Sequence, residues 1–383
     1  MPFFPEVSLF SRSSEEWSKL LYDDREMCAK PAPLGYSITL TTAHLIAAPI
    51  YAVAFYTLYA EKSSNFQVYK RYLAIHAVSN FLFELHLSVI MKPVLYLPHP
   101  MIRFTGAFNL CFVNGGLTFF VFLFIIVLTC GSIIELFYYR FKLISDSHLC
   151  SDWVKQYASA LNIVRIVLSV MSIVTLLCLG LCVVGLFDQT AHKMRLNVLD
   201  QFPEIMCTST IVLPNTSETG LKPIHLFNIS CLFSILLGTF LCGSCGSVSL
   251  IALREMVQQT KTSLRTVAMH KSFLISLYCQ IGVHGFMLGF PIIVYIVSVI
   301  FNFSKNGKQF PSWKPSIITR IVISDVGYVA IVMASLHGVM STLAMIVFNR
   351  PLSAIAISRI KALFALTNVT VRDISFISMR SSQ

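Results

Sequence analysis

Residues 36–60 of the chain, YSITLTTAHLIAAPIYAVAFYTLYA, contain no aspartate, glutamate, lysine or arginine. An α-helix needs about 20 predominantly apolar residues to cross the hydrocarbon core of a bilayer, so this stretch is long enough for one crossing. Six further apolar stretches follow it, at residues 72–96, 104–138, 162–187, 224–252, 272–301 and 320–348. The sequence therefore predicts an all-α membrane protein, a bundle of seven transmembrane helices over residues 36–348.

The composition agrees with a membrane protein. The chain has 383 residues, of which 55% are hydrophobic and 12% are charged, and its mean hydropathy is +0.72. Soluble domains carry about 25% charged residues, so this chain has too little charge to cover a globular surface in water. No alternation of period two is visible, so we expect neither strands nor a barrel. No internal repeat is visible either, which argues against a transporter built from inverted repeats.

The charge of the chain is basic, at a formal +11. Its 29 lysines and arginines are scattered over short loops, a distribution that favours contact with anionic lipid headgroups over binding to nucleic acid. Sequence signatures of soluble enzymes, such as HExxH, a Walker-type glycine loop or GxSxG, are not present. Cys242 and Cys245 match C-x-x-C but lie within an apolar stretch without a βαβ pattern. We therefore expect no enzymatic activity, no cofactor and no metal.

The orientation of the chain is predicted from glycosylation sequons. Seven spans place the two termini on opposite sides, and the distribution of lysine and arginine does not decide between the two orientations. Asn215 (NTS) and Asn302 (NFS) both lie outside if the N-terminus is outside. We therefore expect an extracellular segment over residues 1–35 and a cytoplasmic tail over residues 349–383.

Two loop cysteines fall on the predicted outer side, where disulfides persist. These are Cys28 in the N-terminal segment and Cys207 in the longest loop, and we expect them to form a bridge. The alternative partner for Cys207 is Cys111, which would lie about 12 Å down the third helix at 1.5 Å per residue.

Ionisable residues within the spans are the candidates for ligand contact. Such residues are costly in a bilayer and by default face a bundle interior or a cavity. They could bind a polar ligand in a shared pocket that opens outward, or they could be buried partners of one another. Arg165 also lies within a span, the fourth. The candidates for ligand contact are Glu84, His86, Asn114, His284 and Asp325.

Two further spans carry small residues at helical spacing. Gly285 and Gly289 allow close helix approach, and Pro291 removes a backbone hydrogen bond, so the sixth span could act as a hinge or simply pack closely. The seventh span ends in SLHGVMSTLAMIVFNRP, residues 335–351. On a helix the small and polar residues of this stretch form one stripe, which we interpret as a surface for helix packing or switching. The stripe contains His337, Gly338, Ser341 and Thr342.

The predicted inner loops and helix ends carry basic residues. Their partner could be an acidic lipid surface, or it could be a signalling protein that docks on the cytoplasmic face. The candidates for this face are Arg140, Arg254, Lys261, Arg265, Lys271 and Arg350.

Several motifs together resemble the nematode serpentine chemoreceptors of the Str superfamily, most closely its Srh and Sri branches. The strongest are HKSFLISLYCQIGVHGF at 270–286 with FPIIVYIVSVIFN at 290–302, and SLHGVMSTLAMIVFNRP at 335–351. YKRYL at 69–73, the Leu97-Pro98 pair and the loop FPEIMCTSTIVLPNTSE at 202–218 add to the resemblance. The chain departs from the family where Leu352 and Ser353 follow the final proline in place of Tyr-Arg. The resemblance covers about residues 31–359.

The resemblance implies a G-protein-coupled chemosensory receptor, of an olfactory kind, in a plasma or ciliary membrane. A small environmental molecule would bind among the outer halves of the helices, and a heterotrimeric G protein would bind the cytoplasmic face. A ligand-gated channel would need a pore-lining polar stripe, and a transporter would need a site for a coupling ion. Both of these alternatives stay open on the residues alone.

Overall fold

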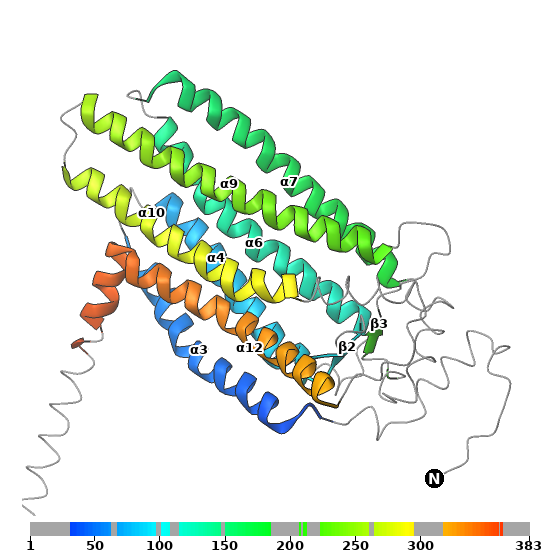
Figure 1. Ribbon diagram of the computed structural model, residues 1–383. Helices are drawn as coiled ribbons and strands as arrows, with labels where there is room; N and C mark the ends of the chain where they lie inside the picture. The colour runs from blue at the N-terminus through cyan, green and yellow to red at the C-terminus, as the bar shows by residue number, and fades with distance from the viewer. Residues whose placement is uncertain are drawn as a thin grey trace, which may run out of the picture.

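The computed structural model describes residues 31–62, 67–96, 101–107, 115–146, 150–184, 207, 210–212, 223–259, 264–294, 317–359 and 361–362. Within these ranges the side chains of residues 178–184, 223–228, 259, 264–267, 269–270, 273 and 317–325 are not described. Most of the described chain is helical, as the apolar stretches predict (Figure 1).

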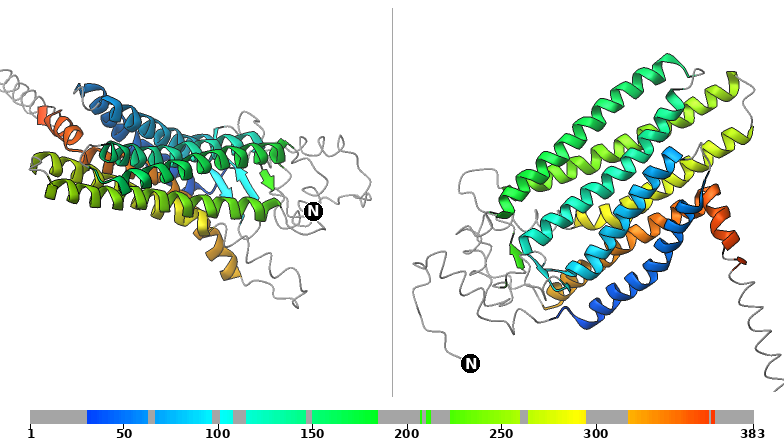
Figure 2. Two further views of the ribbon diagram at one scale, coloured as in Figure 1. Left: turned by 90° about the horizontal axis from the view of Figure 1, so that it is seen from above. Right: turned by 180° about the vertical axis from the view of Figure 1, so that it is seen from behind.

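In the part of the chain that the structure describes, seven helices are long and apolar enough to cross a bilayer. They lie side by side in one bundle, which the views from above and behind show equally (Figure 2). The protein is therefore a multi-pass membrane protein with a bundle of seven transmembrane helices. The helices are α3 (Leu34–Ala60), α4 (Gln67–Leu85), α6 (Gly115–Ser145), α7 (Asp152–Val184), α9 (Pro223–Gln259), α10 (Leu264–His284) and α12 (Ile317–Phe348).

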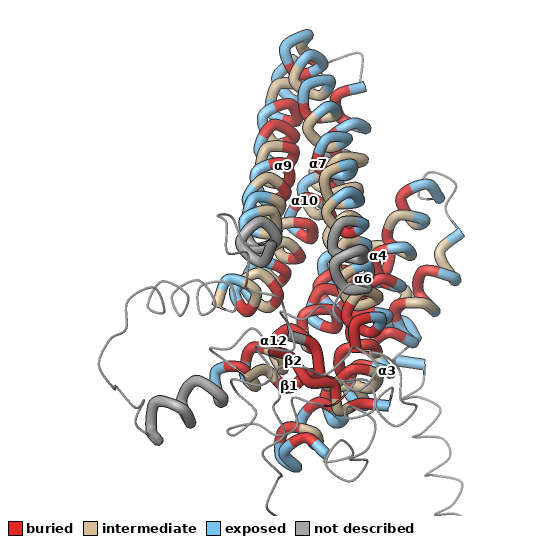
Figure 3. Tube along the Cα trace, turned by 90° about the vertical axis from the view of Figure 1, so that its right-hand side faces the viewer, coloured by how far each residue is buried: buried red, intermediate tan, exposed pale blue. Residues whose placement is uncertain are grey.

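The packing order is set by two helices that each touch several others. Helix α6 packs against α4, α7 and α9, and helix α12 packs against α3, α4 and α10. Buried and exposed residues alternate along each helix (Figure 3), so each helix has one face in the bundle and one face outward. The outward face of α7 is apolar and includes Ile163, Ile166, Val170 and Ile173. Such a face is suited to lipid tails.

A small sheet closes one end of the bundle, which we name the sheet end. It consists of β1 (Pro93–Leu95), β2 (Met101–Phe104) and β3 (Thr210–Val212), paired antiparallel in that order. The expectation of no strands was wrong. Strands of three or four residues are too short to show an alternation in the sequence. The sheet also takes Phe104 out of the third predicted span, whose helix α6 instead runs from Gly115 to Ser145.

Among the described residues, the second span ends in a π-helical segment and the sixth span contains another. Helix α4 continues as η2 (His86–Met91) and stops at Lys92, which is left-handed with φ 39° and is followed by Pro93. Helix α10 continues as η4 (Gly285–Gly289), where the Phe290 amide donates to the Gly285 carbonyl. Pro291 has no amide hydrogen for the turn before it, which accounts for the widened geometry there. π-Turns inside helices are frequent at functional sites.

The opposite end of the bundle, which we name the far end, is where α3, α6, α9 and α12 end and α4, α7 and α10 begin (Figure 1). The chain leaves α12 at Asn349 and is again helical over residues 350–359. Leu352 and Ala356 of this short helix are buried in the core of the bundle. Residues that directly follow the seventh span therefore pack against the other helices.

Candidate functional site: a polar core in the transmembrane bundle

His76 of α4 connects three helices through hydrogen bonds. The Ser132 hydroxyl of α6 donates to the Thr129 carbonyl at 2.7 Å, so it accepts a hydrogen bond from His76 Nδ1, 2.7 Å away. The His76 Nε2 atom then carries no proton and accepts from Ser341 of α12 at 3.0 Å and from the Asn80 amide at 3.2 Å. His76, Asn80 and Ser341 are all fully buried. This network joins α4, α6 and α12 at one level of the bundle.

Two further histidines lie beside His76. The ring of His284, at the end of α10, is 5.4 Å from the ring of His76 and 5.2 Å from the ring of His337 on α12. His337 also makes an edge contact with Phe83 of α4, with 4.5 Å between ring centroids. The structure therefore brings together a predicted ligand residue, His284, and residues of the predicted packing stripe.

Gly338 lies at a close approach of α12 to α3 and α4. A Cβ atom at Gly338 would lie 2.6 Å from the Tyr51 hydroxyl of α3 and 2.9 Å from the Asn80 carbonyl of α4. Neither distance is compatible with a normal van der Waals contact. Only glycine therefore allows α3, α4 and α12 to meet at this point.

Glu84 is held in a second polar group, nearer the sheet end. Its side chain is 1% exposed, and its two carboxylate oxygens lie 2.9 and 3.1 Å from His44 Nδ1 on α3. The Ser88 hydroxyl lies 2.9 Å from Glu84 Oε1. Glu84 is therefore buried against a polar partner, but this partner is His44 and not one of the other candidates for ligand contact.

The Glu84 group continues toward the sheet end as a polar seam between α3 and α4. One helical turn beyond Ser88, the Lys92 ammonium donates to the Ser37 hydroxyl at 3.2 Å and to the Thr41 hydroxyl at 3.0 Å. Ser37, Thr41 and His44 lie at helical spacing on α3, opposite Glu84, Ser88 and Lys92. We name this set of six residues the α3–α4 seam.

His86 points away from the α3–α4 seam. Its Nε2 atom donates to the Thr118 carbonyl of α6 at 3.2 Å, and its ring stacks on Phe122. Between described residues, no hydrogen bond or ion pair joins Glu84, His86 and His284 to one another. These three predicted ligand residues therefore each have a different hydrogen-bond partner and are not bonded to one another.

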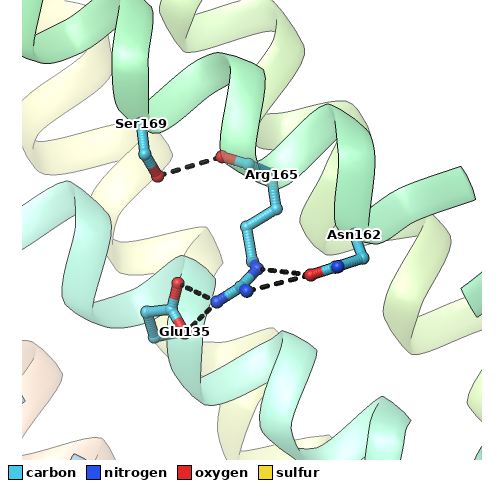
Figure 4. A network of polar contacts seen from close by, with 4 residues as sticks. All are labelled: Glu135, Asn162, Arg165 and Ser169. Carbon is cyan, nitrogen blue, oxygen red and sulfur yellow. Dashed lines mark hydrogen bonds and ion pairs between the residues drawn. The ribbon is translucent and has the colours of Figure 1, made fainter. Parts of the chain in front are cut away.

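An ion pair within the spans joins α6 to α7 (Figure 4). Arg165 Nη1 lies 2.6 Å from Glu135 Oε1 and 2.7 Å from Glu135 Oε2. Asn162, one turn before Arg165, accepts from its Nη2 atom at 2.9 Å. The guanidinium also lies over the Tyr138 ring, 4.3 Å from its centroid. Arg165 therefore has its charge matched and most of its donors occupied.

The predicted basic residues have different environments at the far end. Arg140 is buried, with its guanidinium carbon 3.4 Å from the centroid of the Tyr69 ring. Arg254, Lys271 and Arg350 are exposed. A hydrogen bond of 3.0 Å from Ser272 to the Phe348 carbonyl holds the start of α10 against the end of α12.

The loop before α7 also lies at the far end, outside the spans. The Ser151 hydroxyl donates to Glu255 of α9 at 3.0 Å. Burial raises the pKa of the neighbouring Cys150 thiol, and the negative charge of Glu255 raises it further. This thiol is therefore protonated at neutral pH.

Several predicted residues lie outside what the structure describes. Cys207 is disulfide-bonded, but its predicted partner Cys28 is not among the described residues, so that pairing stays a prediction. Asn114, Lys261, Asn215 and Asn302 also lie outside the described ranges, and the side chains of Arg265 and Asp325 are not described. Among the residues that are described, no group of three or more histidine, cysteine or acidic side chains is placed to hold a metal ion.

The sequence did not single out His44, His76 or Glu135 as site residues. Each is an ionisable residue within an apolar stretch, and this signal was available for all three. Their partners could not be predicted, because the direction in which a helix faces its neighbours is not visible in one sequence.

Comparison with known proteins identifies the family. The family model described as serpentine type 7TM GPCR chemoreceptor Srh matches residues 31–310, which is more than half of the chain. No curated protein and no solved structure matches the chain. The family match confirms the resemblance that the sequence motifs carried and agrees with its Srh branch. The chain belongs to the Srh family of serpentine seven-transmembrane chemoreceptors.

Proposed function

We propose that this chemoreceptor is a G-protein-coupled olfactory receptor that binds a small environmental molecule among the helices and signals to a heterotrimeric G protein. In this proposal the sheet end and residues 1–35 face outward, and the far end and residues 349–383 face the cytoplasm. The receptor would lie in the plasma membrane, including that of sensory cilia.

The proposal rests on the polar core, by which we mean His76, His284, His337 and the residues hydrogen-bonded to them. Hydrogen bonds and ring contacts of His76, His284 and His337 join α4, α6, α10 and α12, and the α3–α4 seam adds α3. A ligand changes a receptor only if it binds one conformation better than another. Contacts that join five helices allow a ligand that shifts one helix to shift the others.

The outer ligand contact is assigned to the α3–α4 seam. Glu84 and Lys92 supply opposite charges, and His44 supplies a polar side chain that is partly exposed. A polar ligand that competes for one of these groups would alter the contact between α3 and α4. His86, Asn114, His284 and Asp325 remain candidates for ligand contact under the same proposal.

The G-protein contact is assigned to the exposed bases at the far end. Arg254, Lys271 and Arg350 lie on α9, on α10 and directly after α12. Basic surfaces attract acidic partner surfaces over distances of a Debye length. Lys261 and Arg265 belong to the same predicted face.

The experiment that tests the function is a chemical panel applied to cells that express the full chain at their surface, with a G-protein reporter. An active compound supports the proposal if the variant Arg254→Ala/Lys271→Ala/Arg350→Ala lowers the reporter signal while surface expression is unchanged. Lys155→Ala is the matched control, because Lys155 is an exposed base at the same end on α7. An ion current that follows the compound without a G-protein signal would overturn the proposal.

A further inference from the structure

Four buried hydrogen-bond acceptors on the helices that carry the histidines of the polar core have no partner among the described residues. They are the Nε2 atoms of His284 and His337 and the side-chain oxygens of Asn80 and Gln280. All four side chains are more than nine-tenths buried. Buried polar atoms in native proteins are nearly always paired, with protein or with ordered water.

The two histidines are acceptors because their other ring nitrogen must donate. His284 Nδ1 lies 2.9 Å from the Gln280 carbonyl, and His337 Nδ1 lies 2.6 Å from the Ala334 carbonyl. A carbonyl oxygen only accepts, so each Nδ1 carries the proton of a neutral imidazole. Each Nε2 therefore presents a lone pair, and it presents this lone pair to the interior of the bundle.

The two amides are oriented in the same sense. The Asn80 amide nitrogen donates to His76 Nε2, and the Gln280 amide nitrogen donates to Ser276. Each amide therefore leaves its oxygen as the unpaired atom. Asn80 lies one turn from His76, Gln280 lies one turn from His284, and the rings of these histidines are in contact. The two histidine acceptors thus lie together where α4, α10 and α12 meet, and each amide acceptor lies one helical turn away, on α4 or on α10.

Unpaired hydrogen-bond acceptors are satisfied by a ligand that donates hydrogen bonds. We propose that the junction of α4, α10 and α12 binds internal water, whose O–H groups donate to the four acceptors. Water is the small donor available in a buried polar site, and a buried water typically makes about 3 hydrogen bonds. A metal ion is a weaker match. Both ring nitrogens of the third histidine, His76, already have hydroxyl partners, and no group of three or more histidine, cysteine or acidic side chains among the described residues is placed to hold a metal ion.

The water site lies beside two features that would move in the conformational change of the proposed receptor function. His284 directly precedes the π-turn η4, and Gly338 lies beside His337 at the close approach of α12 to α3 and α4. Water can exchange hydrogen-bond partners when helices shift, so the junction can rearrange without leaving polar atoms unpaired.

Hydroxyl-radical footprinting by X-ray radiolysis tests the proposal, because bound water forms radicals that label the side chains around it. The full chain is used in lipid nanodiscs, with labelling measured by mass spectrometry. We expect labelling at His284 and His337 to be several-fold higher than at Phe137 and Phe141, which are buried in the apolar core cluster and serve as controls. Equal, background labelling at all four residues would overturn the proposal.

Two further measurements keep the outcome unambiguous. In a hydrated junction, His337→Leu removes a water ligand and lowers the apparent melting temperature; in a dry junction, the same change removes an orphaned acceptor and raises it. Zinc chloride alone is added to the parent in parallel. Binding of one zinc per chain that His284→Leu abolishes would show that a cation, and not water, is the ligand, and would overturn the proposal.

Discussion

Arg165 of α7 directs one guanidinium nitrogen at both carboxylate oxygens of Glu135 on α6, at 2.6 and 2.7 Å. Arg165 lies about 20 Å from the start of α7 at Asp152, and Glu135 lies about 15 Å from the end of α6 at Ser145. Both residues thus lie within the lengths of the two candidate spans, away from the helix ends. The two side chains are 24% and 34% exposed, so the pair is only partly buried between the helices.

The ion pair should stabilise the contact between α6 and α7. Arg165→Leu leaves the Glu135 carboxylate without its counter-ion inside the bilayer, and Glu135→Leu leaves Arg165 in the same condition. Because removing one partner of a buried pair costs about 3–5 kcal/mol and this pair is partly exposed, we expect a loss of about 1–3 kcal/mol for either change. The measurement is surface expression together with the apparent melting temperature of the purified receptor.

The double variant distinguishes the pair from a simple packing effect. Glu135→Leu/Arg165→Leu removes both charges, so it should be more stable than either single variant. If the losses of the two single variants simply add in the double variant, the two side chains do not stabilise one another.

The sequence predicted the seven helices because each is a long run of apolar residues, a property that depends on no distant contact. The pair of Glu135 with Arg165, and that of Glu84 with His44, could not be predicted. Each pair depends on how two helices are rotated about their axes, and one sequence does not contain this information. The π-turn after His284 was only partly foreseen, as a possible hinge at Gly285, Gly289 and Pro291.

Gly338 should tolerate no side chain. In Gly338→Ala the new methyl group meets the Tyr51 hydroxyl and the Asn80 carbonyl, at 2.6 and 2.9 Å, and we expect a loss of about 1–3 kcal/mol from overpacking. Thermal unfolding of the purified receptor measures it. Gly131→Ala is the matched control, since nothing lies within 4 Å of its new methyl group.

A second change identifies the clash at Gly338. Tyr51→Phe removes the nearest atom, so Gly338→Ala/Tyr51→Phe should recover part of the stability relative to Tyr51→Phe alone. A loss at Gly338→Ala that equals the effect at Gly131→Ala would show that the helices are not in close contact there.

The Cys150 thiol should react slowly with alkylating reagents at neutral pH. Burial and the Glu255 carboxylate raise its pKa, so less thiolate is present at neutral pH, and labelling should increase only as the pH rises above the ordinary range of cysteine. Glu255→Gln removes the second cause and should shift this pH profile downward. Peptide mapping after iodoacetamide treatment measures it, and an identical profile in the variant would exclude an effect of Glu255.

The orientation of the chain predicts glycosylation on two loops. Asn215 and Asn302 carry sequons and face outward if the N-terminus is outside. Digestion with a glycosidase should therefore reduce the apparent mass of the receptor expressed in animal cells. Asn215→Gln/Asn302→Gln should abolish this shift. Asn368 carries a sequon (NVT) in the predicted cytoplasmic tail, so Asn368→Gln should leave the shift unchanged. A shift that persists in the double variant would contradict the proposed orientation.

The α3–α4 seam predicts a shared effect of Glu84 and His44 on ligand response. Glu84→Gln removes the charge from the 2.9 Å contact and His44→Gln removes its imidazole. Both should therefore shift the dose-response curve of an active compound to higher concentration by a similar factor, at unchanged surface expression. His284→Gln and Asp325→Asn test the other predicted ligand residues in the same assay. Ser79→Ala is the matched control, because the Ser79 hydroxyl bonds to the Ile75 carbonyl of its own helix.

If Glu84→Gln and His44→Gln both respond like the parent, the ligand binds elsewhere in the bundle. If both variants are lost from the cell surface instead, the contact between Glu84 and His44 is structural. The ligand role of the seam is then decided by the dose-response curve of Thr41→Val, because the exposed hydroxyl of Thr41 accepts a hydrogen bond from Lys92.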